Sequence, residues 1–147
     1  MIVSELMERD VVTCHPDENL EVAARLMWDN NCGSILAIRE DGVPIGIVTD
    51  RDIAMSCMLN HKALWELHAR DVTNSRPLHT CAEHDDIKSA LNTMQVHRIR
   101  RLPVVDESGR LQGIISIDDI ITQSAEQAPE LSFRDTMDTL KAVCIQH

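Results

Sequence analysis

The chain contains one segment that occurs twice. The octapeptide GIVTDRDI at residues 46–53 is matched by GIISIDDI at 113–120, and the offset between the two is 113 − 46 = 67. The same offset relates further pairs upstream: Gly42 and Gly109, Met27 and Met94, Ala23 and Ala90, Cys14 and Cys81, Thr13 and Thr80. The repeat predicts two copies of one structural unit. Because a unit of roughly 60 residues is marginal by itself, we expect the two to pack on one another.

Within each copy the hydrophobic pattern changes its period in the same order, which predicts strand, helix, strand, strand, helix. In the first copy the first strand is expected at 11–13, and Asp17 is a suitable N-cap for the helix that follows. The apolar face of this helix is Leu20, Ala23, Ala24 and Met27, and the same face returns in the second copy as Ile87, Ala90, Leu91 and Met94. A stripe with this spacing is typical of a helix face turned to a core.

Two aliphatic runs follow the first helix of each copy and flank a turn sequence. The runs are 34–38 and 44–48 around Asp41-Gly42, and 102–105 and 111–116 around Ser108-Gly109. Each pair predicts a β-hairpin, and a second helix is expected to start at Thr49 or Ser116. The fold class is therefore mixed α/β, of the α+β type.

The order of these predicted elements sets the expected domain boundaries. The first repeat takes residues 1–62 and the second 63–125, with Trp65 and Leu67 anchoring the crossing between them. Residues 126–147 form a tail outside the repeat. Its spacing of Phe133, Met137, Leu140 and Val143 after Pro129 predicts a further helix.

Charge and composition argue against several classes of partner. The net charge is 14 − 24 = −10, which repels polyanions, and an aromatic content of 2% leaves little for base stacking. Nucleic acid is therefore an unlikely partner. The exception to the acidic balance is VHRIRRLPVV, where His97, Arg98, Arg100 and Arg101 fall within five positions.

Membrane, metal and disulfide signals are weak in this sequence. No apolar run approaches the roughly 20 residues that a bilayer span needs, and the start is acidic, so we expect no membrane association and a cytoplasmic location. Cys14, Cys32, Cys57, Cys81 and Cys144 form no C-x-x-C pair, which predicts reduced, mostly buried thiols. The histidines lack zinc-site spacing, so no metal site is expected.

Two interpretations fit the duplicated motif. Thr49-x-x-Asp52 and Ser116-x-x-Asp119 match a capping box, in which hydroxyl and carboxylate satisfy backbone N–H groups at a helix start. The glycines at 46 and 113 also allow close backbone approach, and a helix N-terminus favours an anion. The motif can therefore cap a helix, bind a nucleotide, or do both.

The repeat ending in G-h-h-[TS]-x-x-D-[IL] resembles the cystathionine-β-synthase (CBS) domain, and residues 1 to about 125 resemble a tandem CBS pair, also called a Bateman module. The resemblance implies two β-α-β-β-α repeats packed sheet to sheet with pseudo-two-fold symmetry. It also implies two clefts that bind AMP, ADP, ATP or S-adenosylmethionine. Many such pairs are homodimers.

The resemblance assigns residues to both clefts. The aspartate holds the ribose, the hydroxyl residue lies near the phosphate, and an aliphatic with the first strand of the opposite repeat encloses the adenine. The first cleft would comprise Ile47, Thr49, Asp52, Pro77, Leu78, His79, Arg100, Arg101 and Pro103. The second would comprise Val11, Val12, Thr13, Gly33, Ser34, Ile114, Ser116 and Asp119.

The two predicted clefts differ in charge. IRRLPVVD at 99–106 is similar to a segment of the γ regulatory subunit of AMP-activated protein kinase whose His and Arg face phosphates, which implies that role for Arg100 and Arg101. The equivalent positions of the first copy are Gly33 and Ser34, so the second cleft lacks a local cation. Arginine–phosphate hydrogen bonds contribute on the order of 1.5–3 kcal/mol. We therefore expect the first cleft to bind a nucleotide more tightly.

Three functions follow from these alternatives. The first is a regulatory module that senses an adenine nucleotide and acts through a dimer or an unidentified partner protein. The second is a ligand-free dimerisation scaffold, in which the boxes are only caps. The third, an enzyme, is disfavoured because no GxSxG, HExxH or P-loop pattern occurs and the motif aspartates already have roles. We expect no required cofactor and no catalytic residues.

Overall fold

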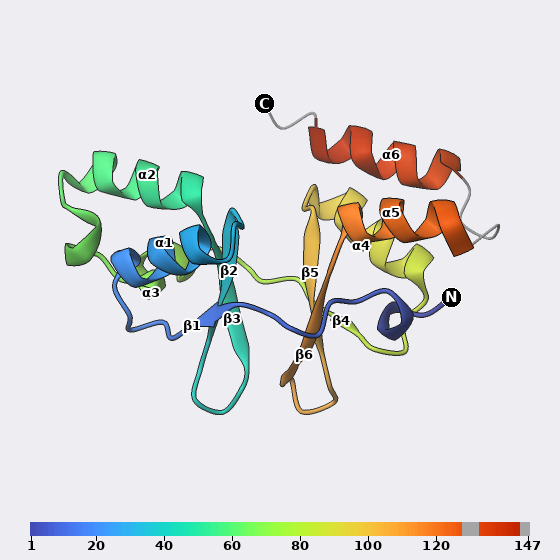
Figure 1. The fold of residues 1–147 in the computed structure, drawn as a ribbon, viewed down its shortest axis with the longest axis horizontal. Helices are drawn as coiled ribbons and strands as arrows, with labels where there is room; N and C mark the ends of the chain where they lie inside the picture. Colours follow the sequence, from blue (N-terminus) through green and yellow to red (C-terminus); the bar gives the residue numbers. More distant parts are fainter. Residues whose placement is uncertain (128–132, 145–147) are drawn as a thin grey trace. The chain divides into compact units, whose positions relative to one another are not determined.

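The computed structural model of this chain describes residues 1–127 and 133–144 (Figure 1). The predicted helix breaker Pro129 lies outside the described residues. In chain order the elements are η1 (Val3–Glu5), β1 (Thr13–Cys14), α1 (Leu20–Asp29), β2 (Ser34–Ile38), β3 (Pro44–Thr49), α2 (Asp50–Asn60), η2 (Leu64–Glu66), α3 (Ala69–Thr73), β4 (Cys81–Ala82), α4 (Ile87–His97), β5 (Arg101–Val105), β6 (Leu111–Ser116), α5 (Ile117–Gln127) and α6 (Phe133–Cys144). The mixed α+β class and the repeated order of elements are confirmed.

The chain forms two compact units. The repeat-1 unit is 11–78, and the repeat-2 unit combines 1–10 with 79–147. Each contains one three-stranded sheet, ordered β1-β2-β3 or β4-β5-β6, with a parallel first pair and an antiparallel hairpin. Both predicted hairpins are confirmed, and each has a register shift at the same place, after Ala37 and after Val104.

Each unit buries a hydrophobic cluster of its own. In the repeat-1 unit the apolar stripe of α1 packs on the inner faces of β2 and β3, and Ile53 of α2 completes the layer. In the repeat-2 unit α4 and α5 do the same over β5 and β6. Of the predicted core stripes, Leu20, Ala23 and Met27 are buried, as are Ile87, Ala90, Leu91 and Met94. Ala24 is only half-buried and packs at the edge of its cluster.

The segment that precedes each repeat packs with the other repeat. Val3 and Leu6 are buried in the core of the repeat-2 unit, whereas Leu67, Ala69 and Val72 are buried in the core of the repeat-1 unit. We call residues 1–10 and 67–76 the lead-in segments. This exchange divides the chain differently from the predicted ranges 1–62 and 63–125.

Hydrogen bonds show that the two lead-in segments are equivalent. Ala69 donates its backbone N–H to Glu18 O at 3.0 Å, and Val3 donates to Asp85 O at 2.9 Å. Leu20 donates to Leu67 O at 2.8 Å, and Ile87 donates to Met1 O at 3.1 Å. The donors Ala69 and Val3 are 69 − 3 = 66 residues apart, whereas the acceptors Asp85 and Glu18 are 85 − 18 = 67 residues apart. The second lead-in segment is therefore separated from the repeat that follows it in sequence by one residue more than the first lead-in segment is.

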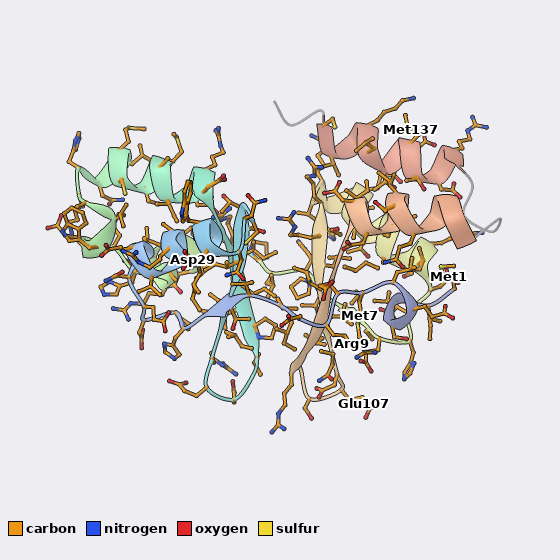
Figure 2. All side chains as sticks on the ribbon, in the orientation of Figure 1. Met1, Met7, Arg9, Asp29, Glu107 and Met137 are labelled. Carbon is orange, nitrogen blue, oxygen red and sulfur yellow. The ribbon has the colours of Figure 1, made fainter. Side chains whose placement is uncertain are left out.

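Glycines in β3 and β6 allow the lead-in segments to approach. A Cβ built on Gly46 would lie 2.5 Å from Thr73 Cβ, and one on Gly113 would lie 2.7 Å from Glu8 O and 3.0 Å from Met7 Sδ. Met7 is labelled on the N-terminal segment in Figure 2. The motif glycines therefore serve packing of the lead-in segment in both units.

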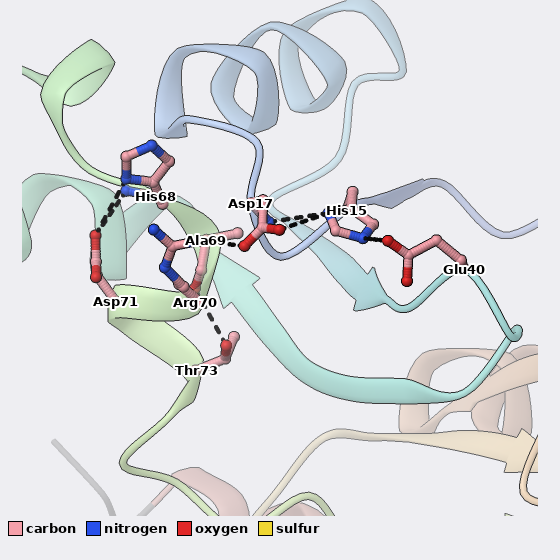
Figure 3. A network of polar contacts seen from close by, with 8 residues as sticks. All are labelled: His15, Asp17, Glu40, His68, Ala69, Arg70, Asp71 and Thr73. Carbon is pink, nitrogen blue, oxygen red and sulfur yellow. Dashed lines mark hydrogen bonds and ion pairs between the residues drawn. The ribbon is translucent and has the colours of Figure 1, made fainter.

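Polar contacts fasten the lead-in segment of the repeat-1 unit (Figure 3). Arg70 of α3 forms an ion pair with Asp17, and the backbone N–H of Asp17 donates to His15 Nδ1 at 3.1 Å. His15 Nε2 in turn lies 2.7 Å from Glu40 Oε1 on the β2–β3 turn. The network joins three separate stretches of this unit.

Three local predictions were wrong. The N-cap of α1 is Asn19, whose Oδ1 accepts the N–H of Val22 at 3.1 Å, because Asp17 is held two residues earlier in the turn that contacts Arg70. Trp65 is not an anchor: its side chain is 62% exposed on η2, and Leu67 alone is buried. The first strand also begins two residues later than expected, at Thr13.

The tail supplies a sixth α-helix to the described structure, as its spacing predicted. Figure 1 shows α6 lying along α4 and α5, and both helices contact it. Thr136, Thr139 and Val143 are buried on its inner face, and Leu140 packs against the core. Among the described residues, no helix is both long and apolar enough to span a bilayer.

Candidate functional site

The duplicated motif forms a helix cap in both units. In the repeat-1 unit, Asp52 donates its N–H to Thr49 Oγ1 at 3.1 Å, and Thr49 donates its N–H to Asp52 Oδ2 at 2.9 Å. In the repeat-2 unit the corresponding distances between Asp119 and Ser116 are 3.1 and 3.0 Å. The capping interpretation is confirmed. It leaves Oδ1 of each aspartate without a hydrogen bond from the residues that the structure describes.

Each cap lies next to the residues of its own unit that were predicted to face a phosphate or to occupy the equivalent position, which are Gly33 and Ser34 in one unit and Arg100 and Arg101 in the other. Ser34 pairs with Thr49, and Asp50 N–H donates to Gly33 O at 3.1 Å. Arg101 pairs with Ser116, and Ile117 N–H donates to Arg100 O at 2.8 Å. Each cap therefore has a strand end next to it. In one unit that strand end carries Gly and Ser, and in the other it carries two arginines.

The first aliphatic residue of each motif lies on the more open side of its sheet, and the second lies in the core. In β3, Gly46 and Val48 are buried, whereas Ile47 and Thr49 between and after them are half-buried. The same alternation in β6 leaves Ile114 and Ser116 half-buried. In the repeat-1 sheet, Thr13 is level with Leu36, which pairs with Ile47. The hydroxyl residue Thr49, the aliphatic residue Ile47 and Thr13 of the first strand therefore lie on the same face of this sheet.

Each unit holds part of both predicted sites. The repeat-1 unit contains Ile47, Thr49, Asp52, Pro77 and Leu78 of the first, and Val11, Val12, Thr13, Gly33 and Ser34 of the second. The repeat-2 unit contains His79, Arg100, Arg101 and Pro103 of the first, and Ile114, Ser116 and Asp119 of the second. Both units therefore carry the same kinds of residue at equivalent places, and they differ in charge.

Arg76 contacts a residue of the predicted first site and is absent from the predicted set. Its guanidinium lies 2.9 Å from Asp52 Oδ2. The side chain of Arg76 is 51% exposed, whereas that of Asp52 is 16% exposed, so the carboxylate is the more buried partner. Arg76 immediately precedes Pro77, so extending the predicted set by one residue would have included it. Asp119 instead accepts the hydroxyl of Ser116 at 2.6 Å.

Two arginines of the predicted cationic cluster, Arg98 and Arg100, have contacts within the repeat-2 unit. Arg100 lies 3.2 Å from Asp118 Oδ1, and both side chains are more than half exposed. Such an exposed pair contributes only about 0–1 kcal/mol, so a phosphate can compete for the guanidinium. Arg98 caps the C-terminus of α4 in the left-handed conformation (φ 54°), which gives it a backbone role.

His79, predicted to lie near adenine, stacks on His97. The ring centroids are 3.6 Å apart and the planes differ by 17°. The stack connects the start of the second repeat to the last turn of α4. It fixes one face of the His79 ring and makes His97 part of the surroundings of the predicted site.

Two matches to one domain model identify the class of protein. The CBS domain model matches residues 3–58 and again 69–126, so the chain belongs to the CBS domain family and contains a pair of such domains. Each match begins within a lead-in segment and ends in the helix that follows a capping box. The resemblance inferred from the repeat is confirmed.

Curated relatives share the pair within longer chains. An uncharacterized protein of Methanopyrus kandleri is 37% identical over 119 residues, which is 81% of this chain and 60% of that one. A homoserine O-acetyltransferase of Methanosalsum zhilinae is 34% identical over 80% of this chain and 23% of its own. An inosine-5′-monophosphate dehydrogenase of Thermoplasma acidophilum is 36% identical over 78% and 22%. The chain thus spans less than two thirds of each.

Solved structures agree on the fold. A CBS domain protein of Thermoplasma acidophilum has a TM-score of 0.79 at 22% identity, covering 97% of this chain and 75% of that one. The CBS domain pair of protein MJ0100, in complex with 5′-methylthioadenosine and S-adenosyl-L-methionine, has a TM-score of 0.70 at 25% identity, covering 85% and 96%. A protein of Pyrobaculum aerophilum complexed with AMP has a TM-score of 0.72 at 24% identity, covering 86% and 100%.

Proposed function

We propose that this CBS pair is a regulatory module that binds an adenine nucleotide, of the AMP, ADP or ATP type, or S-adenosylmethionine. The first site would comprise Ile47, Thr49, Asp52, Pro77, Leu78, His79, Arg100, Arg101 and Pro103. The second would comprise Val11, Val12, Thr13, Gly33, Ser34, Ile114, Ser116 and Asp119. Binding would alter how the module acts on itself or on a partner protein. No catalytic residue is assigned.

The main support is the motif aspartate at an open helix start. In both units the carboxylate uses Oδ2 for the cap, so its Oδ1 can accept ribose hydroxyls without loss of the cap. The helix N-terminus favours a nearby anion, and the half-buried Ile47 or Ile114 offers an apolar surface to a base. Cap and ligand site are therefore compatible.

The class of ligand is supported by the MJ0100 pair, whose two ligands share an adenosine group. The motif aspartate would recognise the ribose of this adenosine group, and the half-buried isoleucine on the sheet face would contact its base. The group attached to the ribose would then decide between ligands. Arg100 and Arg101 favour a phosphate at the first site, and Gly33 and Ser34 favour a less anionic ligand at the second.

Thermal unfolding with AMP, ADP, ATP and S-adenosylmethionine tests the proposal. A ligand at 100 times its dissociation constant stabilises the folded state by about 2.7 kcal/mol, which raises the melting temperature by several degrees. Calorimetric titration then gives stoichiometry and affinity. The proposal fails if none of the four changes the melting temperature or produces binding heat.

Asp52→Asn and Asp119→Asn form a matched pair of variants for this test. Asparagine keeps an oxygen for the cap but removes the charge and one acceptor oxygen, so the loss of stability should be small. We expect Asp52→Asn to weaken the tighter nucleotide site by about tenfold or more, the effect of losing a charged hydrogen bond. Asp119→Asn should leave that site unchanged. Equal effects of both variants would contradict the ranking.

A second function, a dimerisation scaffold, is favoured by one observation. Both tryptophans of the chain are exposed on the repeat-1 unit, Trp28 by 86% and Trp65 by 62%. Exposed aromatic residues of this size are typical of interfaces. The two functions are compatible, because a dimer can be the means by which a nucleotide-dependent change is transmitted.

Enzyme activity is not proposed for this chain. The acetyltransferase and dehydrogenase activities belong to relatives of which the chain spans less than a quarter. Among the described residues, no group of three or more His, Cys, Asp or Glu side chains could hold a metal ion. The part that these relatives share with the chain is the CBS pair.

A further inference from the structure

The two repeats differ in the size of the side chains between their helices. In the repeat-1 unit α1 and α2 contact each other, and Ala24 of α1 and Ala54 of α2 line the groove between them (Figure 1). Their counterparts in the second repeat are Leu91 and Ile121, because 91 − 24 = 121 − 54 = 67. The first repeat therefore has only a methyl group at two places where the second has a full aliphatic side chain.

The groove that these alanines open has a volume of about 750 Å³. Its lining includes the buried side chains of Met27 and Ile53 and the half-buried side chain of Leu64. Pockets that hold small molecules are typically mostly apolar and have volumes of roughly 300–1,000 Å³. The groove is therefore large enough for an organic molecule with an apolar body.

Asp50, in the first turn of α2, is the charged residue among those that line the groove. Its Oδ1 accepts the N–H of Arg51 at 2.8 Å, and a Cβ built on Gly33 would lie 3.5 Å from its Oδ2. Within the described part of the chain, no cationic side chain forms an ion pair with Asp50. The counterpart of Asp50 is the buried Ile117, because 117 − 50 = 67, so the carboxylate is particular to the first repeat.

Trp28 adds an aromatic surface to the same groove. Its side chain is 86% exposed, although it is one of the lining residues. Its counterpart in the second repeat is Gln95, because 95 − 28 = 67. The face of an indole ring attracts organic cations, and a carboxylate forms charge-assisted hydrogen bonds with an ammonium group. The first repeat thus has both kinds of cation-binding side chain at the groove.

We propose that the α1–α2 groove of the repeat-1 unit binds a small organic cation, an amine with an apolar body. The apolar body would lie between Ala24 and Ala54, and the ammonium group would contact the carboxylate of Asp50 and the ring of Trp28. The net charge of −10 attracts such a molecule and repels an anion. The proposal does not rest on nucleotide binding, because it uses neither motif aspartate.

The charge of Asp50 favours an amine over the other molecules that could cover an exposed apolar groove. A second molecule of this chain has the same net charge of −10, and its contact would have to cover a carboxylate that has no cationic partner. An ammonium group supplies that partner. Trp65 is not among the lining residues, so a dimer that uses this tryptophan is compatible with an amine in the groove.

Fluorescence titration with phenylbutylamine, phenylbutanol and phenylbutyrate, which share one apolar body, tests the proposal. The protein is the Trp65→Phe variant, in which Trp28 is the sole tryptophan. We expect the amine to change the Trp28 emission saturably and to bind at least about tenfold more tightly than the alcohol, with the acid weakest. Amine binding should weaken as salt is added. Equal affinities for amine and alcohol, or no saturable change with the amine up to about 10 mM, would overturn the proposal.

Variants made in the same Trp65→Phe background locate the site. Asp50→Asn should weaken phenylbutylamine binding about tenfold and leave phenylbutanol binding unchanged. Ala54→Ile, which introduces the residue of the second repeat, should fill the groove and abolish both. Both positions are exposed, so the fold should persist, which far-UV circular dichroism checks. Asp118→Asn, which removes an exposed aspartate from the first turn of α5, is the control and should bind the amine normally.

Two further outcomes would contradict the proposal. An amine response that survives Ala54→Ile, or that Asp118→Asn weakens as much as Asp50→Asn does, would mean that the amine binds elsewhere. A Trp28 emission that changes with protein concentration and not with the amine would mean that a second molecule of the chain occupies the groove.

Discussion

At the scale of single residues, the two motif aspartates differ in what else contacts them. Asp52 Oδ2 accepts the Thr49 N–H and also the guanidinium of Arg76, whereas Asp119 Oδ2 accepts both the N–H and the hydroxyl of Ser116. The first carboxylate is thus partly neutralised by a half-exposed cation. A ribose that binds Oδ1 of Asp52 would compete with Arg76 for the charge of the same carboxylate.

This competition predicts the effect of Arg76→Ala. A partly exposed ion pair contributes about 0.2–1 kcal/mol, so its removal should tighten adenosine binding at this site by up to about fivefold. Adenosine is the suitable probe because it has no phosphate for Arg76 to contact. Calorimetric titration of wild type and variant measures the change. Weaker binding in Arg76→Ala would instead mean that Arg76 contacts the ligand directly.

Buried thiols predict a pattern of chemical reactivity. Burial raises the pKa of Cys14 to about 11 and that of Cys81 to about 12, with a smaller contribution from Glu18 or Asp85. Alkylating agents react with the thiolate. We expect iodoacetamide at pH 8 to modify the exposed Cys144 of the folded protein and to spare both buried thiols until urea is added. Peptide mass mapping checks this.

The same thiols predict how stability depends on pH. Their pKa is higher in the folded state than the ordinary value of 9.0, so the folded state holds its protons longer. This contribution to the free energy of unfolding is complete below about pH 8.5 and is lost as the pH rises toward 11. Urea unfolding at pH 7 and 10 should show lower stability at pH 10. The loss should be smaller in a Cys14→Ala/Cys81→Ala variant.

At the scale of elements, β3 and the lead-in segment of the repeat-1 unit approach so closely at Gly46 that a side chain at this position would clash. Gly46→Ala would place its methyl group 2.5 Å from Thr73 Cβ in α3. Overpacking of this kind costs roughly 1–3 kcal/mol. Gly33→Ala is the control, because its nearest contact would be an ordinary 3.5 Å to Asp50. We expect urea unfolding to show a clear loss for the first variant and little change for the second.

The elements that the sequence predicted well are those with local signals. Both hairpins follow from aliphatic runs around Gly42 and Gly109, and both caps follow from a motif four residues long. The errors arose where a distant contact decides. Asp17 would be a good N-cap by composition, but Arg70, far away in the sequence, holds it elsewhere. Trp65 has the composition of an anchor and yet lies exposed.

The site was predictable to the same extent. The hydroxyl and aspartate positions could be read from the repeat, and the structure places each at a helix start. Arg76 could not be found in this way, because its ion pair with Asp52 depends on the path of the chain after α3. Arg100 was predicted to face the phosphate at the Asp52 site, which stays a prediction, and its ion pair with Asp118 beside the cap of its own unit was not foreseen.

At the scale of the whole molecule, the exchange of lead-in segments determines which pieces of the chain can fold. The fragment 11–78 keeps every residue of the repeat-1 core. The fragment 1–62, drawn at the expected repeat boundary, loses Leu67, Ala69 and Val72 from that core and adds a lead-in segment with no place to pack.

This predicts a difference between the two fragments in isolation. We expect 11–78 to show a cooperative thermal transition by far-UV circular dichroism, although its melting temperature should be below that of the full chain. The fragment 1–62 should lack a cooperative transition, because removing three buried apolar residues costs several kcal/mol. A cooperative transition in 1–62 alone would show that the lead-in segment is dispensable.

The exchange also has a consequence for the order of events during synthesis. The repeat-1 unit is continuous in sequence and can close once residue 78 has left the ribosome. Residues Met1–Asp10 are made before the repeat-1 unit, and yet they must wait for hydrogen-bond partners that belong to the second repeat, such as Asp85 and Ile114. This lead-in segment is therefore synthesised ahead of the repeat-1 unit and reaches its final position after that unit has closed.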